Sequence, residues 1–320
     1  MPHGDAHHGG HAHGHAHGHA HGHAHAAAPG GHDTAFAIGV GLNTALVAAQ
    51  VWFGVAAGSL ALIADAGHNL GDVLGLAMAW GAAVLSRRPP SARRTYGYGR
   101  SSILASLANA VLLLIGVGAI ALEAIRRLFA PTAVHGLTMM WVAIAAILIN
   151  GSTAWLFMRG REHDLNIRGA FLHMAADAAV SAAVVLAALV IHFTGWDWLD
   201  PLTSLLIAGV ITAGTWGLLR DSVNLAMDVV PEEIDQTLVA AYLGGLPGVA
   251  EVHDLHIWSI STTEVALTAH LVRPGAGIDD RLLAEACLEL RTRFGIGHAT
   301  FQVESGDPAH PCALAPAHVI

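Results

Sequence analysis

Six long apolar stretches determine what this chain can fold into. Of its 320 residues, 54% are hydrophobic and only 12% are charged, and the mean hydropathy is +0.53. A bilayer core of about 30 Å requires roughly 20 apolar residues in each helix that spans it. Stretches of this kind occur at 34–57, 60–85, 101–125, 137–158, 169–193 and 201–222. The sequence therefore predicts an α-helical membrane protein with a six-transmembrane-helix bundle.

The arginines indicate which loops face the cytoplasm. The loop "SRRPPSARRTYGYGR" between the second and third stretches and the loop "RGREHDLNIR" between the fourth and fifth are rich in arginine, whereas the opposite loops hold only Arg126 and Arg127. Because basic loops stay on the cytoplasmic side, we expect both termini in the cytoplasm. No organelle signal is evident, so a bacterial inner membrane is the expected host. The net charge of -9 argues against a nucleic-acid partner.

Residues 1–33 have the composition of a flexible cytoplasmic tail. They hold 12 of the 23 histidines and almost no apolar side chain larger than alanine, so they cannot build a core. They lack the apolar segment of a signal peptide. Alternating imidazoles are suitable donors for zinc, copper, nickel or cobalt. We expect the tail to buffer metal ions, although a plain polar tail has the same composition.

The sequence changes to a soluble pattern after the sixth stretch. A helix is predicted over 232–243, a hairpin over 250–260 and 264–273, a second helix over 279–293 and a strand over 299–304. A domain of this size has a small core, which favours association with a second copy. The predicted division of the chain is 1–33, 34–228, 229–305 and a loose tail at 306–320.

Two transmembrane stretches carry the same pair of polar residues. "ADAGHNLGD" places His68 and Asp72 four residues apart, and "FLHMAADAAVS" does the same with His173 and Asp177. Residues at this spacing share one face of a helix, and both pairs fall near mid-membrane. A lone carboxylate there costs at least about 2.5 kcal/mol. A divalent cation would offset that cost, and two imidazoles with two carboxylates suit tetrahedral zinc better than magnesium, calcium or copper(I).

Metal binding is not the only role that such polar residues can have in a bundle. They could form hydrogen bonds between helices, as the buried asparagines of other stretches could: Asn43, Asn109, Asn150 and Asn224. Two matched pairs favour a metal site over this structural role. An intramembrane metalloprotease would need an H-E-x-x-H string, which the sequence lacks. A membrane metal sensor remains open, because only flux distinguishes it from a transporter.

The chain resembles the cation diffusion facilitator family of zinc transporters over residues 34–305. The resemblance rests on "GSLALIADAGHNLGD", "RTYGYGRSSILASLANA", "NIRGAFLHMAADAAVS" and "VHDLHIWSIS". It implies that the two His-Asp pairs form a zinc-preferring transport site. It also implies a C-terminal cytoplasmic ferredoxin-like α+β domain, a homodimer, and exchange of metal for protons by alternating access. An efflux pump whose main substrate is cobalt, nickel or cadmium is the alternative.

The resemblance also implies sites outside the transport ligands. His253, His270 and Glu304 match a terminal-domain metal site between protomers, where zinc would be a structural or regulatory ion. Alternatively, His253 and His256 are ordinary polar residues of a strand. The loop before the third stretch lacks the histidines and acids of a further family site, so that site is expected to be absent. The C-terminal tail keeps only Cys312, which argues against a thiolate site there.

Four more residues are expected to support these sites. Asp65 and Asn69 would lie beside His68 or along the exit path, where a carboxylate can orient a ligand histidine. By the resemblance, Arg100 and Asp228 would join the membrane and terminal domains through a salt bridge. The alternative role of Arg100 is that of an ordinary basic anchor at the membrane surface.

Overall fold

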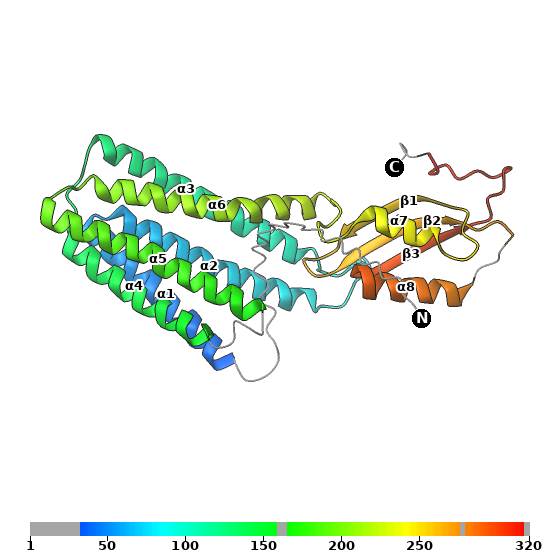
Figure 1. Ribbon diagram of the computed structural model, residues 1–320, viewed down its shortest axis with the longest axis horizontal. Helices are drawn as coiled ribbons and strands as arrows, with labels where there is room; N and C mark the ends of the chain where they lie inside the picture. Colours follow the sequence, from blue (N-terminus) through cyan, green and yellow to red (C-terminus); the bar gives the residue numbers. More distant parts are fainter. Residues whose placement is uncertain (1–32, 159–164, 276–278, 317–320) are drawn as a thin grey trace, which may run out of the picture.

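The computed structural model describes residues 33–158, 165–275 and 279–316. A bundle of long helices forms one part of the elongated molecule, and a small α/β domain lies at one end of it (Figure 1). The histidine-rich tail predicted to buffer metal lies outside the described residues, apart from the first residue of α1.

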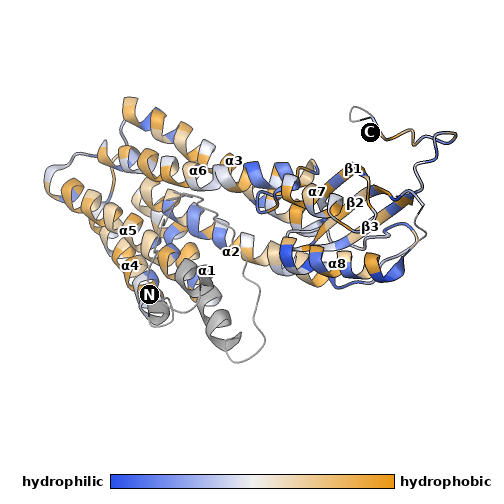
Figure 2. Ribbon diagram, turned by 45° about the vertical axis from the view of Figure 1, so that its right-hand side comes forward, coloured by the Kyte–Doolittle hydropathy of each residue, from blue (hydrophilic) through white to orange (hydrophobic). Residues whose placement is uncertain are grey.

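The bundle consists of the helices that hydropathy predicts. Five helices are long and apolar enough to cross a membrane, and the first contributes a shorter apolar part, Gly41–Ala57. Their outer faces are strongly hydrophobic (Figure 2), with large exposed side chains such as Trp52, Trp80 and Trp141. The prediction of a helical membrane protein is confirmed. The helices are α1 (Asp33–Ala57), α2 (Leu60–Ser86), α3 (Ser101–Phe129), α4 (Gly136–Met158), α5 (Leu165–Thr194) and α6 (Leu199–Ala226).

The helices pack in two groups. α3 runs along α6, while α4 packs on α5 and α1 packs on both α2 and α4 (Figure 1). α2 also contacts α3 and α6, so it connects the two groups. The shared core contains Leu62, Met139, Val184 and Ile207, which are almost fully buried. α5 also contacts α2 and α6, so the two helices with the His-Asp pairs meet.

The start of α2 is fixed by polar contacts from other helices. Gly58 has a φ of +68°, which turns the chain from α1 into α2. Ser59 caps α2, because its Oγ accepts a hydrogen bond from the backbone N–H of Leu62 at 3.2 Å. Asp200 of α6 accepts hydrogen bonds from Ser59 Oγ at 2.6 Å and from the backbone N–H of Leu60 at 2.7 Å. These contacts hold α2 in register against α6.

The terminal domain has the predicted α-β-β-α-β order. Strand β2 lies between β1, with which it is antiparallel, and β3, with which it is parallel. Leu243, Leu267, Leu271 and Leu290 form the buried centre between the helices and the sheet. The elements are α7 (Gln236–Gly244), β1 (Glu251–Ser259), β2 (Val265–Val272), α8 (Asp280–Phe294) and β3 (Ile296–Glu304).

Two boundaries in this domain differ from the predicted ones. α7 begins at Gln236 rather than near residue 232, because the Asp235 side chain caps the backbone N–H groups of Thr237 and Leu238. β3 begins at Ile296 rather than near residue 299, because Gly295 ends α8 in the left-handed conformation and lets the strand start at once.

Candidate metal sites

The two His-Asp pairs of α2 and α5 meet inside the bundle. His68 Nε2 lies 3.0 Å from Asp177 Oδ1, and His173 Nε2 lies 3.2 Å from Asp72 Oδ2. Each imidazole therefore contacts the carboxylate of the other helix. His173 Nε2 is also 3.6 Å from Asp177 Oδ2 within α5. The spacing of four residues on each helix is what brings both members of a pair to the facing side.

The donor atoms of this cluster are close enough to share one cation. One ligand atom each from His68, Asp72 and Asp177 lies within 4.8 Å of the others. The His68 and His173 rings are 6.0 Å apart between centroids and nearly perpendicular, at 70°. Asp177 is only 1% exposed. Asp72 is partly exposed, with 19% of its side chain accessible. A divalent cation between the imidazoles would offset the negative charge of the buried Asp177 and of Asp72.

A buried polar network lies one helical turn from His68. Asp65 Oδ2 accepts hydrogen bonds from Gln50 Nε2 at 2.5 Å and from Ser181 Oγ at 3.2 Å. Asn69 Nδ2 donates to Gln50 Oε1 at 3.1 Å. All four side chains are fully buried. Asp65 and Asn69 thus lie beside the cluster, and α1 contributes Gln50 to the same network. The supporting role of Asp65 and Asn69 stays a prediction.

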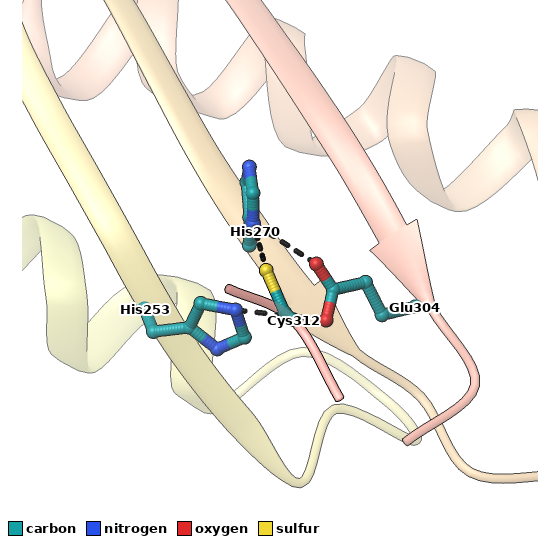
Figure 3. Close-up of side chains that lie close together, drawn as sticks. All are labelled: His253, His270, Glu304 and Cys312. Carbon is teal, nitrogen blue, oxygen red and sulfur yellow. Dashed lines mark hydrogen bonds and ion pairs between the residues drawn. The ribbon is translucent and has the colours of Figure 1, made fainter. Parts of the chain in front are cut away.

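A second cluster lies at one end of the terminal-domain sheet (Figure 3). His253 on β1 is the direct cross-strand neighbour of His270 on β2, and their rings are 5.2 Å apart between centroids. Glu304 ends β3, with one carboxylate oxygen 2.9 Å from His270 Nδ1 and the other 3.6 Å from His253 Nε2. Cys312 of the C-terminal tail completes a set whose ligand atoms all lie within 4.8 Å of one another.

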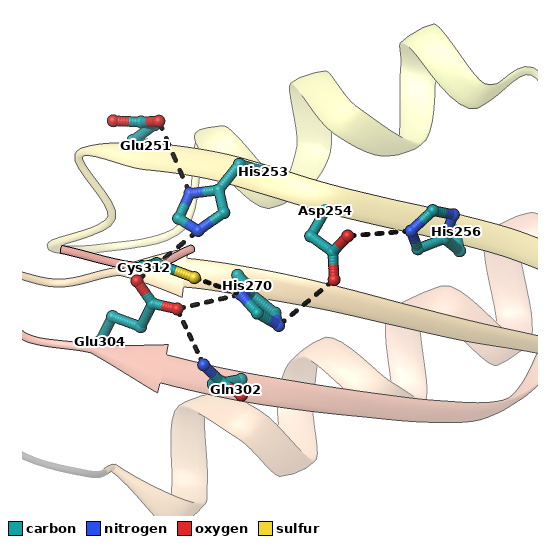
Figure 4. Close-up of polar contacts among 8 residues, drawn as sticks. All are labelled: Glu251, His253, Asp254, His256, His270, Gln302, Glu304 and Cys312. Atoms are coloured by element: carbon teal, nitrogen blue, oxygen red, sulfur yellow. Dashed lines mark hydrogen bonds and ion pairs between the residues drawn. The ribbon is translucent and has the colours of Figure 1, made fainter. Parts of the chain in front are cut away.

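Polar neighbours surround this second cluster (Figure 4). Asp254 lies between two histidines, 3.4 Å from His270 Nε2 and 2.9 Å from His256 Nε2. Burial raises the pKa of the Glu304 carboxyl, whereas hydrogen bonds from Cys312 and Gln302 lower it. The nearby imidazoles of His253 and His270 also lower this pKa, and as a result the pKa of Glu304 lies below its ordinary value. Glu304 is therefore ionised at neutral pH, which is the form that binds a metal ion.

His256 lies apart from these ligand atoms. Its side chain is 46% exposed and pairs with Asp254 rather than with Glu304. The two histidines of "VHDLHIW" therefore have different environments, with His253 buried in the cluster and His256 at the surface.

Contacts between the two parts of the molecule lie near the start of α3. Arg100 Nη2 donates to Asp228 Oδ1 at 2.6 Å, and both side chains are about half exposed. The backbone N–H of Thr262 donates to Ser102 Oγ at 3.0 Å. The Tyr96 ring meets the His298 ring edge-on at 5.5 Å between centroids. The terminal domain thus contacts α3 and the loop before it, while Arg100 joins the start of α3 to the segment that follows α6.

Several residues of these sites cannot be identified from the sequence. Gln50 and Ser181 give no signal, because a single polar residue in an apolar stretch does not reveal which helix it faces. Asp254 does not stand out beside the histidines of β1. Cys312 is visible in the sequence, but one cysteine in a tail predicts nothing about where the tail runs. The structure places it among potential ligand atoms, and the expectation that the tail forms no thiolate site stays a prediction.

The chain is similar to known protein families and to individual proteins. Residues 36–225 match the cation efflux transmembrane domain, and residues 231–306 match the cation efflux protein cytoplasmic domain. The metal cation efflux system protein CzcD of Cupriavidus metallidurans is 37% identical over 291 residues, which is 90% of each chain. The zinc transporter ZitB of Escherichia coli is 37% identical over 272 residues, covering 84% of this chain and 86% of that protein.

One further relative and one solved domain structure are also similar to this chain. The cadmium, cobalt and zinc/H(+)-K(+) antiporter of Bacillus subtilis is 35% identical over 265 residues, covering 80% of this chain and 84% of that protein. A solved structure of the metal-bound C-terminal domain of the C. metallidurans CzcD transporter is 35% identical and covers 22% of this chain and 99% of that one, with a TM-score of 0.21.

Proposed function

Because the chain belongs to the cation efflux family, also known as the cation diffusion facilitators, we propose that it exports zinc from the cytoplasm in exchange for protons. The observation that carries this proposal is the meeting of two His-Asp pairs between α2 and α5. Relatives named as zinc transporters and as metal/proton antiporters support it. The expected location is the inner membrane of a bacterium, with both termini in the cytoplasm.

The four residues His68, Asp72, His173 and Asp177 would form the transport site. Two nitrogen and two oxygen donors suit tetrahedral zinc, whereas calcium prefers six to eight oxygens and copper(I) prefers sulfur. The ligands lie inside helices rather than in loops, so small rotations of α2 against α5 would change access to the ion. Asp65 and Asn69 would orient His68 or receive the ion on its way out.

Proton exchange follows from the ligand chemistry. An imidazole must lose its proton before it binds a metal ion, so protons and zinc compete for the same atoms. A site open to a neutral cytoplasm would load zinc. The same site open to a more acidic outside would take up protons and release the ion.

The terminal domain would bind metal and join two copies of the chain. Its small core favours association, and the matched family domain is a cytoplasmic one. His253, His270 and Glu304 would hold a structural or regulatory zinc ion. The pair Arg100–Asp228 would transmit changes between the two parts, and the histidine-rich tail would buffer metal ions.

One observation favours a broader range of metal substrates. A relative that is 35% identical is named as a cadmium, cobalt and zinc antiporter. A mixed nitrogen and oxygen site also accepts cobalt and cadmium. The protein would then be an efflux pump of broader range, with zinc as one substrate. A membrane sensor that binds metal without moving it is the remaining alternative.

Flux measurements on the purified protein test these proposals. Proteoliposomes would be loaded and assayed in parallel with zinc, cadmium, cobalt and nickel. We expect zinc to move fastest and Asp177→Asn to abolish movement while the protein stays inserted. Binding without flux would identify a sensor, and faster movement of cadmium or cobalt would overturn the zinc preference.

A further inference from the structure

The C-terminal tail contributes a sulfur atom to the terminal-domain cluster. Cys312 Sγ lies 3.4 Å from His270 Nδ1. It points toward the same space as the side chains of His253 and Glu304 (Figure 3). The four potential ligand atoms of these residues lie within 4.8 Å of one another. The cluster therefore offers four donors from one protomer, drawn from three strands and the tail.

The buried imidazole of His253 is incompletely satisfied. Its side chain is only 7% exposed, and neither ring nitrogen has a hydrogen-bond partner in the described part of the chain. The nearest carboxylate oxygens, from Glu251 and Glu304, are 3.5 and 3.6 Å away. A buried polar group without a partner costs of order 1–3 kcal/mol. A cation bound by Nε2 would remove that cost, so this histidine independently indicates a ligand.

The spacing of the donors suits a tetrahedral ion. Zinc bonds of about 2.0 Å to nitrogen or oxygen and about 2.3 Å to sulfur place neighbouring donors of a set with one sulfur roughly 3.3–3.5 Å apart. The Cys312–His270 distance is 3.4 Å and the His253–Glu304 distance is 3.6 Å. His270 and Glu304 are closer, at 2.9 Å, and would separate slightly around an ion.

The Asp254 carboxylate faces the ring nitrogen of His270 that points away from the cluster. His270 Nε2 faces Asp254 Oδ2 at 3.4 Å, while Nδ1 of the same ring faces Glu304 and Cys312. Ligand histidines commonly donate their other ring N–H to a carboxylate, which fixes the tautomer and raises the basicity of the metal-binding nitrogen. Asp254 is therefore a positioning residue for the cluster.

The backbone after β3 returns the tail to the cluster. The carbonyl of Glu304 accepts a hydrogen bond from the backbone N–H of Arg273 at 2.7 Å, which holds the end of β3 beside β2. Gly306 then turns the chain with a φ of +68°. A side chain at this glycine would be strained by that backbone conformation and would meet Val272 at 3.0 Å. Cys312 follows this turn and reaches the imidazoles.

We propose that Cys312 is the fourth ligand of a closed metal site formed within one protomer by His253, His270, Glu304 and Cys312. The thiolate selects borderline and soft divalent cations, such as zinc, cadmium and cobalt, over magnesium and calcium. Four protein ligands leave no open position, so the ion is structural or regulatory and fastens the tail to the sheet. This inference rests on the terminal-domain part of the proposed function and is independent of transport.

Cobalt provides a direct test on the full-length, metal-free protein. Bound thiolate gives Co²⁺ an intense near-ultraviolet charge-transfer band, which nitrogen and oxygen ligands do not give. The chain has only two cysteines, Cys287 and Cys312. We expect the band in the wild-type protein and in Cys287→Ser, and its loss in Cys312→Ser and His253→Ala. Absence of the band from the wild type, or its survival in Cys312→Ser, would overturn the proposal.

Alkylation of the thiols gives a second readout that does not depend on the spectrum. Mass spectrometry would follow the rate at which a maleimide modifies each cysteine with and without zinc. We expect zinc to slow modification of Cys312 at least tenfold and to leave Cys287 unchanged. His253→Ala should abolish this protection, whereas Asp177→Asn should retain it. If zinc protects neither cysteine, the proposal is wrong even where zinc transport is normal.

Discussion

The identity of each donor atom determines which ion the intramembrane cluster accepts. His68 and His173 offer nitrogen atoms in fixed directions, which favours a small tetrahedral ion. A carboxylate can bind through one or both oxygens and therefore adapts to a larger ion. Selectivity at this site should thus depend on the imidazoles, while the total affinity also depends on the negative charge of Asp72 and Asp177.

Replacing His68 by Asp should admit cadmium. The substitution exchanges a directional nitrogen donor for a carboxylate that can chelate a larger ion, so the zinc-over-cadmium flux ratio should fall by about tenfold, or roughly 1.4 kcal/mol. Flux of both metals in proteoliposomes provides the measurement. His192→Asp, at the exposed end of α5, is the control. An unchanged ratio in the folded His68→Asp protein would argue against this residue as a ligand.

The elements of the fold differ in how well the sequence predicts them. Hydropathy locates all six bundle helices because the lipid environment demands about 20 apolar residues in each. The His-Asp pairs are also visible, since both lie on one helix face at a fixed spacing. Contacts between residues that are far apart in the chain cannot be predicted in this way. Gln50 contacts Asp65 from another helix, and Cys312 contacts His270 from an irregular tail.

The junction between α2 and α6 allows a stability prediction at this scale. Asp200 is fully buried and accepts hydrogen bonds from Ser59 Oγ and from the backbone N–H groups of Leu60 and Ala61. Asp200→Ala leaves these donors without a partner, so the free energy of unfolding should fall by about 1–3 kcal/mol. Equilibrium unfolding in detergent measures it.

A control on the same helix separates this effect from a general loss of charge. Asp221 is exposed near the other end of α6. Asp221→Ala should change the free energy of unfolding by less than about 0.5 kcal/mol. Equal losses in the two variants would show that the contacts of Asp200 do not stabilise the start of α2.

At the scale of the whole molecule, the bundle and the terminal domain have different tasks in our proposal. The proposed transport ligands all lie on α2 and α5, while a few polar and aromatic contacts near Arg100 link the bundle to the terminal domain. The bundle has its own buried apolar core and does not depend on these contacts. They suit a domain that joins two protomers and responds to metal.

Removal of residues 230–320 should therefore weaken dimerisation and reduce transport without abolishing it. The bundle keeps its ligands and its apolar core, so metal should still bind to the membrane site. Sedimentation in detergent would report the oligomeric state, and zinc flux would report activity. Arg100→Ala is a separate variant, because it breaks the contact with Asp228, which the truncation keeps, and leaves the domain present. A correctly inserted truncated protein that binds no metal would contradict this division of tasks.

Metal-for-proton exchange is the prediction that involves the whole transport cycle. Imidazole has a higher reference pKa than aspartate, about 6.5 against about 3.9, so the histidines are the first of these ligands to take up protons as the pH falls. Protons on the imidazoles exclude the metal ion. Zinc affinity should therefore rise with pH and level off once both imidazoles are neutral. Titration of zinc binding at several pH values would measure this trend.

Vesicles test whether this competition drives transport. With the outside made acidic, the protein should export zinc against its gradient, and a dye inside should report entering protons. Asp177→Ala should stop both signals, because the metal and the protons share that site, whereas Asp221→Ala should preserve both. Zinc movement that ignores the pH gradient and gives no dye signal would indicate a facilitated channel or another coupling ion. Uphill movement in the wild type requires alternating access, since a pore open to both sides dissipates the zinc gradient.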